Sequence, residues 1–229
     1  MIAADTLEVL RTVAAALGEL RDEAMFVGGA ITGFLVTNSA PQRETDDVDL
    51  VVDIATYPDY VQLTERLRAL GFAEDASEGA PICRWTIEGI KVDVMSSGPI
   101  PGPTNRWYAK AMANAQVFAL SAQLSIRIIS APYFIADKLD TFGDGRRGDY
   151  LSSHDLEDII AVIDGRDTIE AEVRSAPHSV REFLSQRFKK LLAHREFVDA
   201  IAGHLRGDSA SQARLPLVLS RMRAIATAA

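Results

Sequence analysis

The segment from Asp47 to Asp53 alternates acidic with aliphatic residues in the way of a half-buried β-strand. Successive side chains of a strand point to opposite faces, so Asp47, Asp49 and Asp53 share one face, and the other is lined by Val48, Leu50 and Val52. Carboxylates that converge repel one another unless a positive charge lies between them, and a divalent cation supplies such a charge. The segment therefore predicts either a metal site or the wet face of an edge strand, and alone it favours neither.

A glycine pair precedes this strand and shifts the balance towards a metal site. Gly28 and Gly29 follow the apolar run 24–27 and come before residues 30–36, which have helical spacing. Backbone N–H groups at the start of a helix, with no Cβ in the way, form a ready anion site. Nucleotide chemistry needs such a phosphate cradle beside paired carboxylates.

A third carboxylate comes from a later predicted strand. Residues 82–87 and 90–95 have strand patterns and are joined by Glu88 and Gly89, a two-residue hairpin signal. In the second strand, Asp93 points away from the face that its aliphatic neighbours share. Taken alone it would be interpreted as a surface aspartate, but beside the first acids it becomes a candidate ligand. Asp53 lies further along its strand, beyond easy reach of the same ions, and is interpreted as a strand-end acid.

The order of the predicted elements indicates an α+β fold. Helical patterns over residues 7–20, 57–70 and 105–115 are interspersed with strand patterns, the last of which cover 117–120 and 124–129. From residue 131 onward every predicted element is helical, including 132–139, a helix that begins near Ser153, 177–197 and a last helix from Arg214. We expect a small mixed sheet flanked by helices in residues 1–130, followed by an α-helical domain, residues 131–229, packed on it.

The charge of the chain is unevenly distributed. The net charge of −8 argues against a general nucleic-acid coat protein, but from Glu170 onward ten Lys and Arg residues face six Asp and Glu residues. The basic residues of one cluster in this part are Arg187, Lys189, Lys190 and Arg195. A solvated helix face is the favoured interpretation of this cluster, and an RNA-contacting patch is the alternative.

Composition also predicts the compartment. The single cysteine, Cys83, cannot form an internal disulfide, which fits a reducing compartment. No apolar run approaches the ~20 residues of a membrane helix, and the N-terminus lacks the pattern of a secretory signal. We expect a cytoplasmic protein with no membrane segment.

These motifs together resemble a known superfamily. Gly28-Gly29, then Arg43-x-Thr45-x-Asp47-Val48-Asp49, then Asp93 in a later strand, resemble the nucleotidyltransferases related to DNA polymerase β. Two further elements are similar to the AbiEii and MenT type of nucleotidyltransferase, namely Lys138 within a helix and the sequence Asp155-x-x-Asp158. The resemblance spans roughly residues 24 to 165.

The resemblance implies a role for each of these residues. Asp47 and Asp49 would hold Mg²⁺, or Mn²⁺, with Asp93 as third ligand or base. Gly28 and Gly29 would bind the β- and γ-phosphates of a nucleoside triphosphate.

The resemblance also assigns residues of the helical half. Lys138 would neutralise triphosphate charge, and Asp155 or Asp158 would complete the catalytic site.

Arg43 is interpreted with equal weight as a phosphate ligand or as the ion-pair partner of the neighbouring Asp46 or Asp47.

Three functions follow as hypotheses. The leading one is a toxin of a toxin–antitoxin pair that moves a nucleoside monophosphate from a triphosphate to RNA, such as tRNA, or to protein, releasing pyrophosphate by a two-metal mechanism. Its partners would be the triphosphate, a cognate antitoxin and an RNA acceptor at the basic C-terminal helices. The second hypothesis is a small-molecule nucleotidyltransferase of the aminoglycoside type. The third is a catalytically silent domain that binds a nucleotide or a partner.

Overall fold

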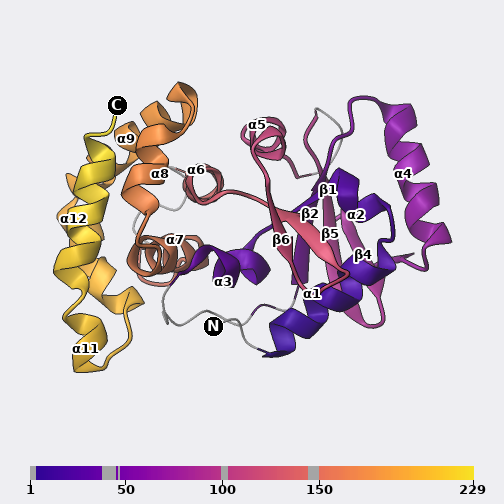
Figure 1. Cartoon of the computed structure of the whole chain (residues 1–229), viewed down its shortest axis with the longest axis horizontal. Coiled ribbons are helices and arrows are strands. Elements are labelled where there is room, and N and C mark those ends of the chain that lie inside the picture. Colours follow the sequence, from indigo (N-terminus) through magenta and orange to yellow (C-terminus); the bar gives the residue numbers. More distant parts are fainter. Residues whose placement is uncertain (1–3, 38–44, 46, 99–102, 144–149) are drawn as a thin grey trace. The chain divides into compact units, whose positions relative to one another are not determined.

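The computed structural model describes residues 4–37, 45, 47–98, 103–143 and 150–229, which form two compact units (Figure 1). The sheet unit contains residues 4–31 and the described residues from 45 to 130. The helical unit contains residues 32–37 and the described residues from 131 to 229. Arg43 and Asp46 lie outside the described residues, as do most of the predicted loops at 98–103 and 143–148.

The described residues of the sheet unit form a mixed sheet of seven strands in the order β3-β4-β5-β2-β1-β7-β6. At its centre β2 runs parallel to β5 and antiparallel to β1, and β1 in turn pairs with β7 in parallel. The strands are β1 (Ala24–Val27), β2 (Asp47–Val52), β3 (Ala73–Glu74), β4 (Arg84–Ile87), β5 (Ile90–Ser96), β6 (Gln116–Ala119) and β7 (Ser125–Ile128). The fold is therefore α+β with a mixed sheet, as predicted.

The hairpin between β4 and β5 confirms the predicted turn. Glu88 and Gly89 both have positive φ, 50° and 80°, as a type I′ turn requires. The turn fixes the pairing of the two strands, so Trp85 lies opposite Val92 and Arg84 lies opposite Asp93.

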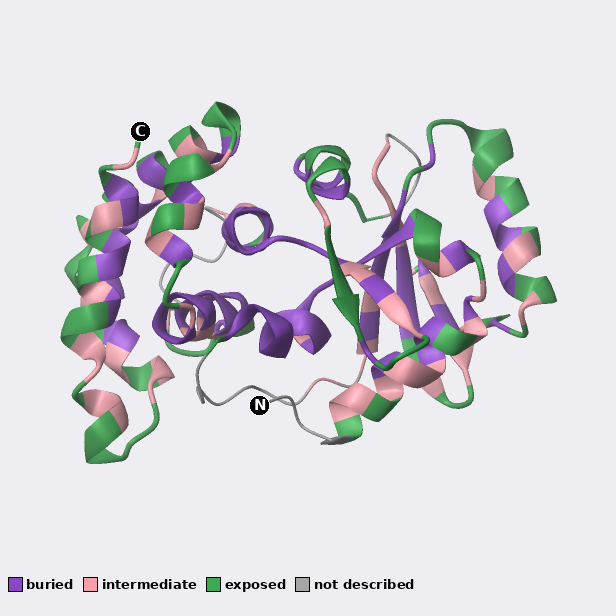
Figure 2. Cartoon of the chain, viewed as in Figure 1, coloured by how far each residue is buried: buried purple, intermediate pink, exposed green. Residues whose placement is uncertain are grey.

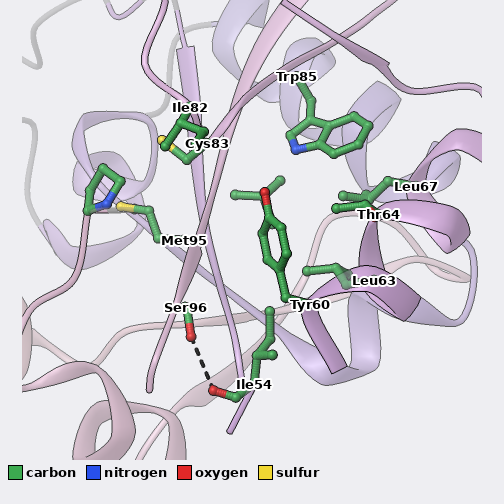
Figure 3. A pocket seen from close by; sticks show the side chains of 12 residues that line it. Ile54, Tyr60, Leu63, Thr64, Leu67, Ile82, Cys83, Trp85, Met95 and Ser96 are labelled. Carbon is green, nitrogen blue, oxygen red and sulfur yellow. Dashed lines mark hydrogen bonds between the residues drawn. The ribbon is translucent and has the colours of Figure 1, made fainter. Parts of the chain in front are cut away.

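Helix α4 (Tyr57–Ala69) covers one face of the sheet. It begins at a capping box between Thr56 and Asp59, with proline in its first turn. Its Leu63 and Leu67 line a pocket together with Trp85 of β4 (Figure 3). The pocket measures about 430 Å³ with its opening included. Because Trp85 and Arg84 alternate along β4, α4 lies on the face opposite to Arg84 and to the carboxylates.

The other helices of the sheet unit are short or amphipathic. Helix α1 ends before Gly18, which adopts a positive φ of 54°. An ion pair between Arg66 of α4 and Glu23 of α2 joins two of the helices through both guanidinium amino groups. These helices are α1 (Ala4–Ala16), α2 (Leu20–Glu23), the 3₁₀ helix η1 (Gly29–Ile31) and α5 (Tyr108–Ala113).

The helical unit contains eight described α-helices and one described 3₁₀ helix. They are α3 (Thr32–Leu35), α6 (Ala131–Phe142), α7 (His154–Gly165), α8 (Ile169–Ser175), α9 (His178–Leu192), α10 (Arg195–Ala200), η2 (Ile201–His204), α11 (Ser209–Gln212) and α12 (Leu215–Ala226). Helices α6 and α7 are buried along most of their length, whereas α9 and α12 each keep one exposed face (Figure 2). Arg214 and Arg221 bind the carbonyl groups at the end of α7, which satisfies acceptors that a helix end leaves open.

Several predicted helices were wrong in extent, and the one expected over residues 7–20 already ends at Ala16. The expected helix over residues 30–36 is a 3₁₀ turn, Gly29–Ile31, followed by the single turn of α3. The expected helix over 177–197 ends at Leu192, and α10 starts afresh after His194, whose backbone is extended. The short elements β3, α8, η2 and α11 were not predicted, because so few residues carry no measurable periodicity.

Candidate active site

Three predicted carboxylates lie side by side on one face of the sheet unit. Asp47 and Asp49 are two residues apart on β2, and Asp49 is the direct partner of Asp93 on the parallel strand β5. Residues paired in register on neighbouring strands point to the same face, so all three side chains share it. Burial along β2 agrees, because Val48 and Leu50 are fully buried while Asp47 and Asp49, which alternate with them, are half-buried.

An arginine that the motif did not include holds two of these carboxylates. Nε of Arg84 donates to Oδ1 of Asp93 at 2.8 Å, and Nη2 donates to Oδ2 of Asp93 at 2.7 Å and to Oδ2 of Asp47 at 3.3 Å. The Arg84 side chain is 19% exposed and that of Asp93 13%, so this pair is largely withdrawn from water. The hydrogen bond to Asp93 raises the pKa of Arg84 above its ordinary high value. The guanidinium therefore stays charged between the carboxylates.

Gly28 packs directly against this site. It lies between β1 and η1 with a positive φ of 71°, a conformation that suits glycine. A Cβ at this position would come within 1.8 Å of Oδ2 of Asp49. The glycine thus leaves room for the Asp49 carboxylate, which explains from packing why a turn of this kind precedes the acidic strand.

Gly29 starts a 3₁₀ helix and not the longer helix that we expected. A helix dipole needs several aligned turns, so little of it acts here. Any anion at this turn would be held by individual backbone N–H groups.

The segment before β2 fixes the first carboxylate. Oγ1 of Thr45 donates to Oδ1 of Asp47 at 3.0 Å, which gives the threonine of the Arg-x-Thr-x-Asp sequence a structural purpose. Asp53 follows the end of β2, is exposed, and accepts a hydrogen bond from Oγ of Ser97 at 2.6 Å. Its interpretation as a strand-end acid is confirmed.

Lys138, Asp155 and Asp158 form a second charged cluster, in the helical unit. Nζ of Lys138 on α6 lies 2.9 Å from Oδ2 of Asp158 and 3.3 Å from Oδ1 of Asp155, both on α7. Burial alone would lower the pKa of Lys138, but the attraction of Asp158 and Asp155 outweighs burial and the pKa is raised. The two aspartates, three residues apart on α7, thus both face Lys138, which is held as their counter-ion.

Asp137, next to Lys138, is an acid that the sequence did not single out. It is 6% exposed, and burial is the main cause that raises its pKa to about 7. Lys138 opposes this shift, whereas Asp155 and Asp140 add to it. The cluster therefore contains a carboxyl group that changes its charge near neutral pH.

Cys83 does not have the properties of a nucleophile. It is buried next to β4 and lines the pocket under α4 (Figure 3). Burial first, and then the charge of Asp93, raises the pKa of its thiol to about 11. At neutral pH it is a protonated packing residue.

A family model matches the chain over residues 11–225, and its description is the nucleotidyl transferase AbiEii toxin of a type IV toxin–antitoxin system. The chain belongs to this family. It is an AbiEii-type nucleotidyltransferase, and the resemblance seen in the sequence is confirmed. Among curated proteins none matches the sequence significantly.

Solved structures show the same fold at low sequence identity. One is an antigenic nucleotidyltransferase-like protein from Paracoccidioides brasiliensis, 18% identical over 92% of this chain and 98% of that chain, with a TM-score of 0.50. A second is JHP933 from Helicobacter pylori, 12% identical over 99% and 94%, with a TM-score of 0.51. A third is ANT(2'')-Ia in complex with adenylyl-2''-tobramycin, 16% identical over 82% and 99%, with a TM-score of 0.51.

The carboxylate oxygens of the sheet unit suit a divalent cation, although the guanidinium of Arg84 occupies the space between Asp47 and Asp93. Carboxylate oxygens are the ligands that Mg²⁺ prefers, and Nη2 of Arg84 shows that one cation reaches both Asp47 and Asp93. Within the described ranges, however, no three His, Cys, Asp or Glu side chains converge closely enough to hold a metal as they stand. To hold a metal, the carboxylates of this site would have to converge further, and the Arg84 amino group would have to leave the space between Asp47 and Asp93.

The predicted site residues thus form two groups. Gly28, Asp47, Asp49 and Asp93 come together in the sheet unit, and Lys138, Asp155 and Asp158 come together in the helical unit. Each group lies within one unit, and Arg43 lies outside the described residues. No helix among the residues described is both long and apolar enough to cross a membrane.

Proposed function

We propose that this AbiEii-type nucleotidyltransferase moves a nucleoside monophosphate from a nucleoside triphosphate to a hydroxyl group of RNA or protein, as the toxin of a toxin–antitoxin pair. The observation that carries the proposal is the set of three carboxylates on one face of β2 and β5, with Gly28 fitted against Asp49. The acceptor oxygen would bond to the α-phosphorus while the bond from that phosphorus to the bridging oxygen breaks. Pyrophosphate leaves, and the hydroxyl proton passes to a base.

The residues of the sheet unit would bind the donor. Asp47 and Asp49 would hold Mg²⁺ or Mn²⁺, and Asp93 would be the third ligand or the base that takes the proton. A bound divalent ion would stabilise the charge that develops on the attacking and leaving oxygens. The backbone N–H groups of Gly28 and Gly29 would hold the β- and γ-phosphates.

The charged cluster of the helical unit would have a catalytic role of its own. Asp155 or Asp158 would contribute a carboxylate, and Lys138 would neutralise triphosphate charge. Lys138 already faces two carboxylates. Lys138 would therefore have to exchange one aspartate for a phosphate oxygen to act on the nucleotide. We place the enzyme in the cytoplasm, where triphosphates and a cognate antitoxin would be available.

The direct test is transfer of label from an α-labelled nucleoside triphosphate to total tRNA or to protein with Mg²⁺ present. We expect Asp47→Asn to reduce transfer by about a hundredfold or more, because it removes a negative charge from the reacting centre. Asp53→Asn is the matched control, since Asp53 lies on the same chain segment, is exposed and has its own partner. Equal transfer by the wild type and Asp47→Asn would refute the proposal.

A small-molecule acceptor is the second candidate. The first 169 residues hold fourteen Lys and Arg against twenty-six Asp and Glu, which would suit a cationic acceptor such as an aminoglycoside. The ANT(2'')-Ia structure, which contains an adenylylated tobramycin, has the same fold. Label found on an added aminoglycoside and absent from RNA and protein would favour this candidate. The hypothesis of a silent domain is not carried forward, because the family is one of nucleotidyltransferases.

A further inference from the structure

We propose that Arg84 is a positioning residue that competes with the divalent cation for Asp47 and Asp93, so that the carboxylate site binds metal weakly until the guanidinium yields. The inference deepens the proposed function and rests on it for the position of the metal. Arg84 lies outside the glycine turn, the acidic strand and the lysine cluster on which that function was argued.

The contacts show competition for the same oxygens. Nη2 of Arg84 reaches Oδ2 of Asp93 at 2.7 Å and Oδ2 of Asp47 at 3.3 Å, so a single nitrogen bridges the two strands that supply the site. A divalent ion bound by both carboxylates would need this position. The two cations exclude each other there, both by volume and by charge repulsion in a largely buried setting.

The contacts of Arg84 allow it to release one carboxylate while it stays bonded to the other. Its Nε bond to Oδ1 of Asp93 is independent of Asp47, and the bond to Asp47 is the longer of the Nη2 contacts. Asp47 is also the more exposed acid, with 35% of its side chain accessible against 13% for Asp93. Arg84 can therefore release Asp47 and keep its Nε bond to Asp93.

The pairing of β4 with β5 makes this arrangement a property of the fold. Arg84 lies opposite Asp93 because the two-residue turn at Glu88 and Gly89 sets the register. A purely structural ion pair would have the same geometry but a different consequence. Removing a structural pair would disorder Asp93 and weaken metal binding, whereas removing a competitor strengthens it.

The test measures Mn²⁺ binding to the full chain by calorimetry, with and without a non-hydrolysable triphosphate analogue. We expect Arg84→Gln to bind Mn²⁺ about tenfold more tightly than the wild type without nucleotide, because a positive charge leaves the site. Arg84→Lys keeps the charge and should stay within about threefold of the wild type. The matched control is Arg66→Gln, which removes a two-bonded arginine of the same unit on α4, away from the carboxylate face.

Each outcome decides the question. If the Arg84→Gln variant binds Mn²⁺ no more tightly than the Arg66→Gln variant, the proposed role of Arg84 is wrong. The Arg84→Gln variant could be unfolded without metal. In that case, refolding at Mn²⁺ concentrations at least tenfold below the wild-type Kd supports competition. Failure of the variant to refold at saturating Mn²⁺ overturns the proposal. Absence of Mn²⁺ binding by the wild type even with the nucleotide analogue refutes the proposed metal site itself, which separates the two failures.

Discussion

Gly28→Ala tests whether the glycine turn and the acidic strand are fitted to each other. The added Cβ would lie 1.8 Å from Oδ2 of Asp49, 2.7 Å from its Cγ and 3.0 Å from its Cβ, whereas ordinary contacts begin at 3.4 Å. Three atoms of one side chain are affected, so rotation of the carboxylate alone does not relieve the overlap. The Asp49 oxygen must move by about 1.6 Å, or the turn must open.

Two separable costs follow from this geometry. Alanine at a φ of 71° is strained by about 1–2 kcal/mol whatever its surroundings. Displacement of a reacting group by about 1 Å costs about a hundredfold in rate, so we expect Gly28→Ala to lose at least that factor in nucleotidyl transfer. The loss of stability should be larger than the backbone strain alone, because the clash adds to it.

Gly79→Ala separates the two costs. Gly79 has a φ of 83° and no atom within 4 Å of an added Cβ, so its substitution carries the strain without the clash. Urea unfolding and transfer of label from an α-labelled triphosphate should be measured on both variants. The reasoning would be refuted if the Gly28→Ala variant unfolded at the same urea concentration as the Gly79→Ala variant and retained more than a third of wild-type nucleotidyl transfer.

Two further predictions concern the buried cluster of the helical unit. Lys138→Met removes the cation that faces Asp155 and Asp158. In urea titrations it should lower the free energy of unfolding by about 3–5 kcal/mol, because buried carboxylates then lose their counter-ion. A loss below about 1 kcal/mol would contradict a buried ion pair. The folded-state pKa of Asp137, about 7, exceeds its unfolded value, so its contribution to stability is complete below about pH 4 and is lost as pH rises through 7. Asp137→Asn should therefore remove up to about 3 kcal/mol of the decline in unfolding free energy between pH 5 and 8, and an unchanged pH profile would count against the shift.

The alternation of side chains along strands accounts for most of what the sequence predicted of the sheet. It placed Asp47, Asp49 and Asp93 on polar faces, and the hairpin signal at Glu88 and Gly89 was confirmed. Arg84 could have been found by the same means. Counting back from a two-residue turn pairs residue 87 with 90 and residue 84 with 93, which puts the arginine opposite the aspartate. What counting could not supply was the reach of the guanidinium across to Asp47, which depends on the parallel pairing of β2 with β5.

The parts that were wrong or missed depend on contacts distant in sequence. Residues 30–36 have helical spacing, yet tertiary packing leaves only a 3₁₀ turn and one α-turn there, and α3 packs against α7 more than a hundred residues later. The elevated pKa of Asp137 arises from burial within the helical unit, which spacing along α6 does not reveal. The division of the chain into domains 1–130 and 131–229 stays a proposal.

The route of the chain between the two units limits how the protein can be taken apart. The backbone passes from the sheet unit to the helical unit after residue 31, returns before residue 45, and passes over again after residue 130. A fragment that stops at residue 130 would carry α3 without α7, and would lose the bonds from Thr37 to Gly165 and from Arg166 to Leu35. Three peptide connections thus tether the units, and the first begins only three residues after Gly28. A protease cut in any single one of them would still leave at least one fragment that carries residues of both units.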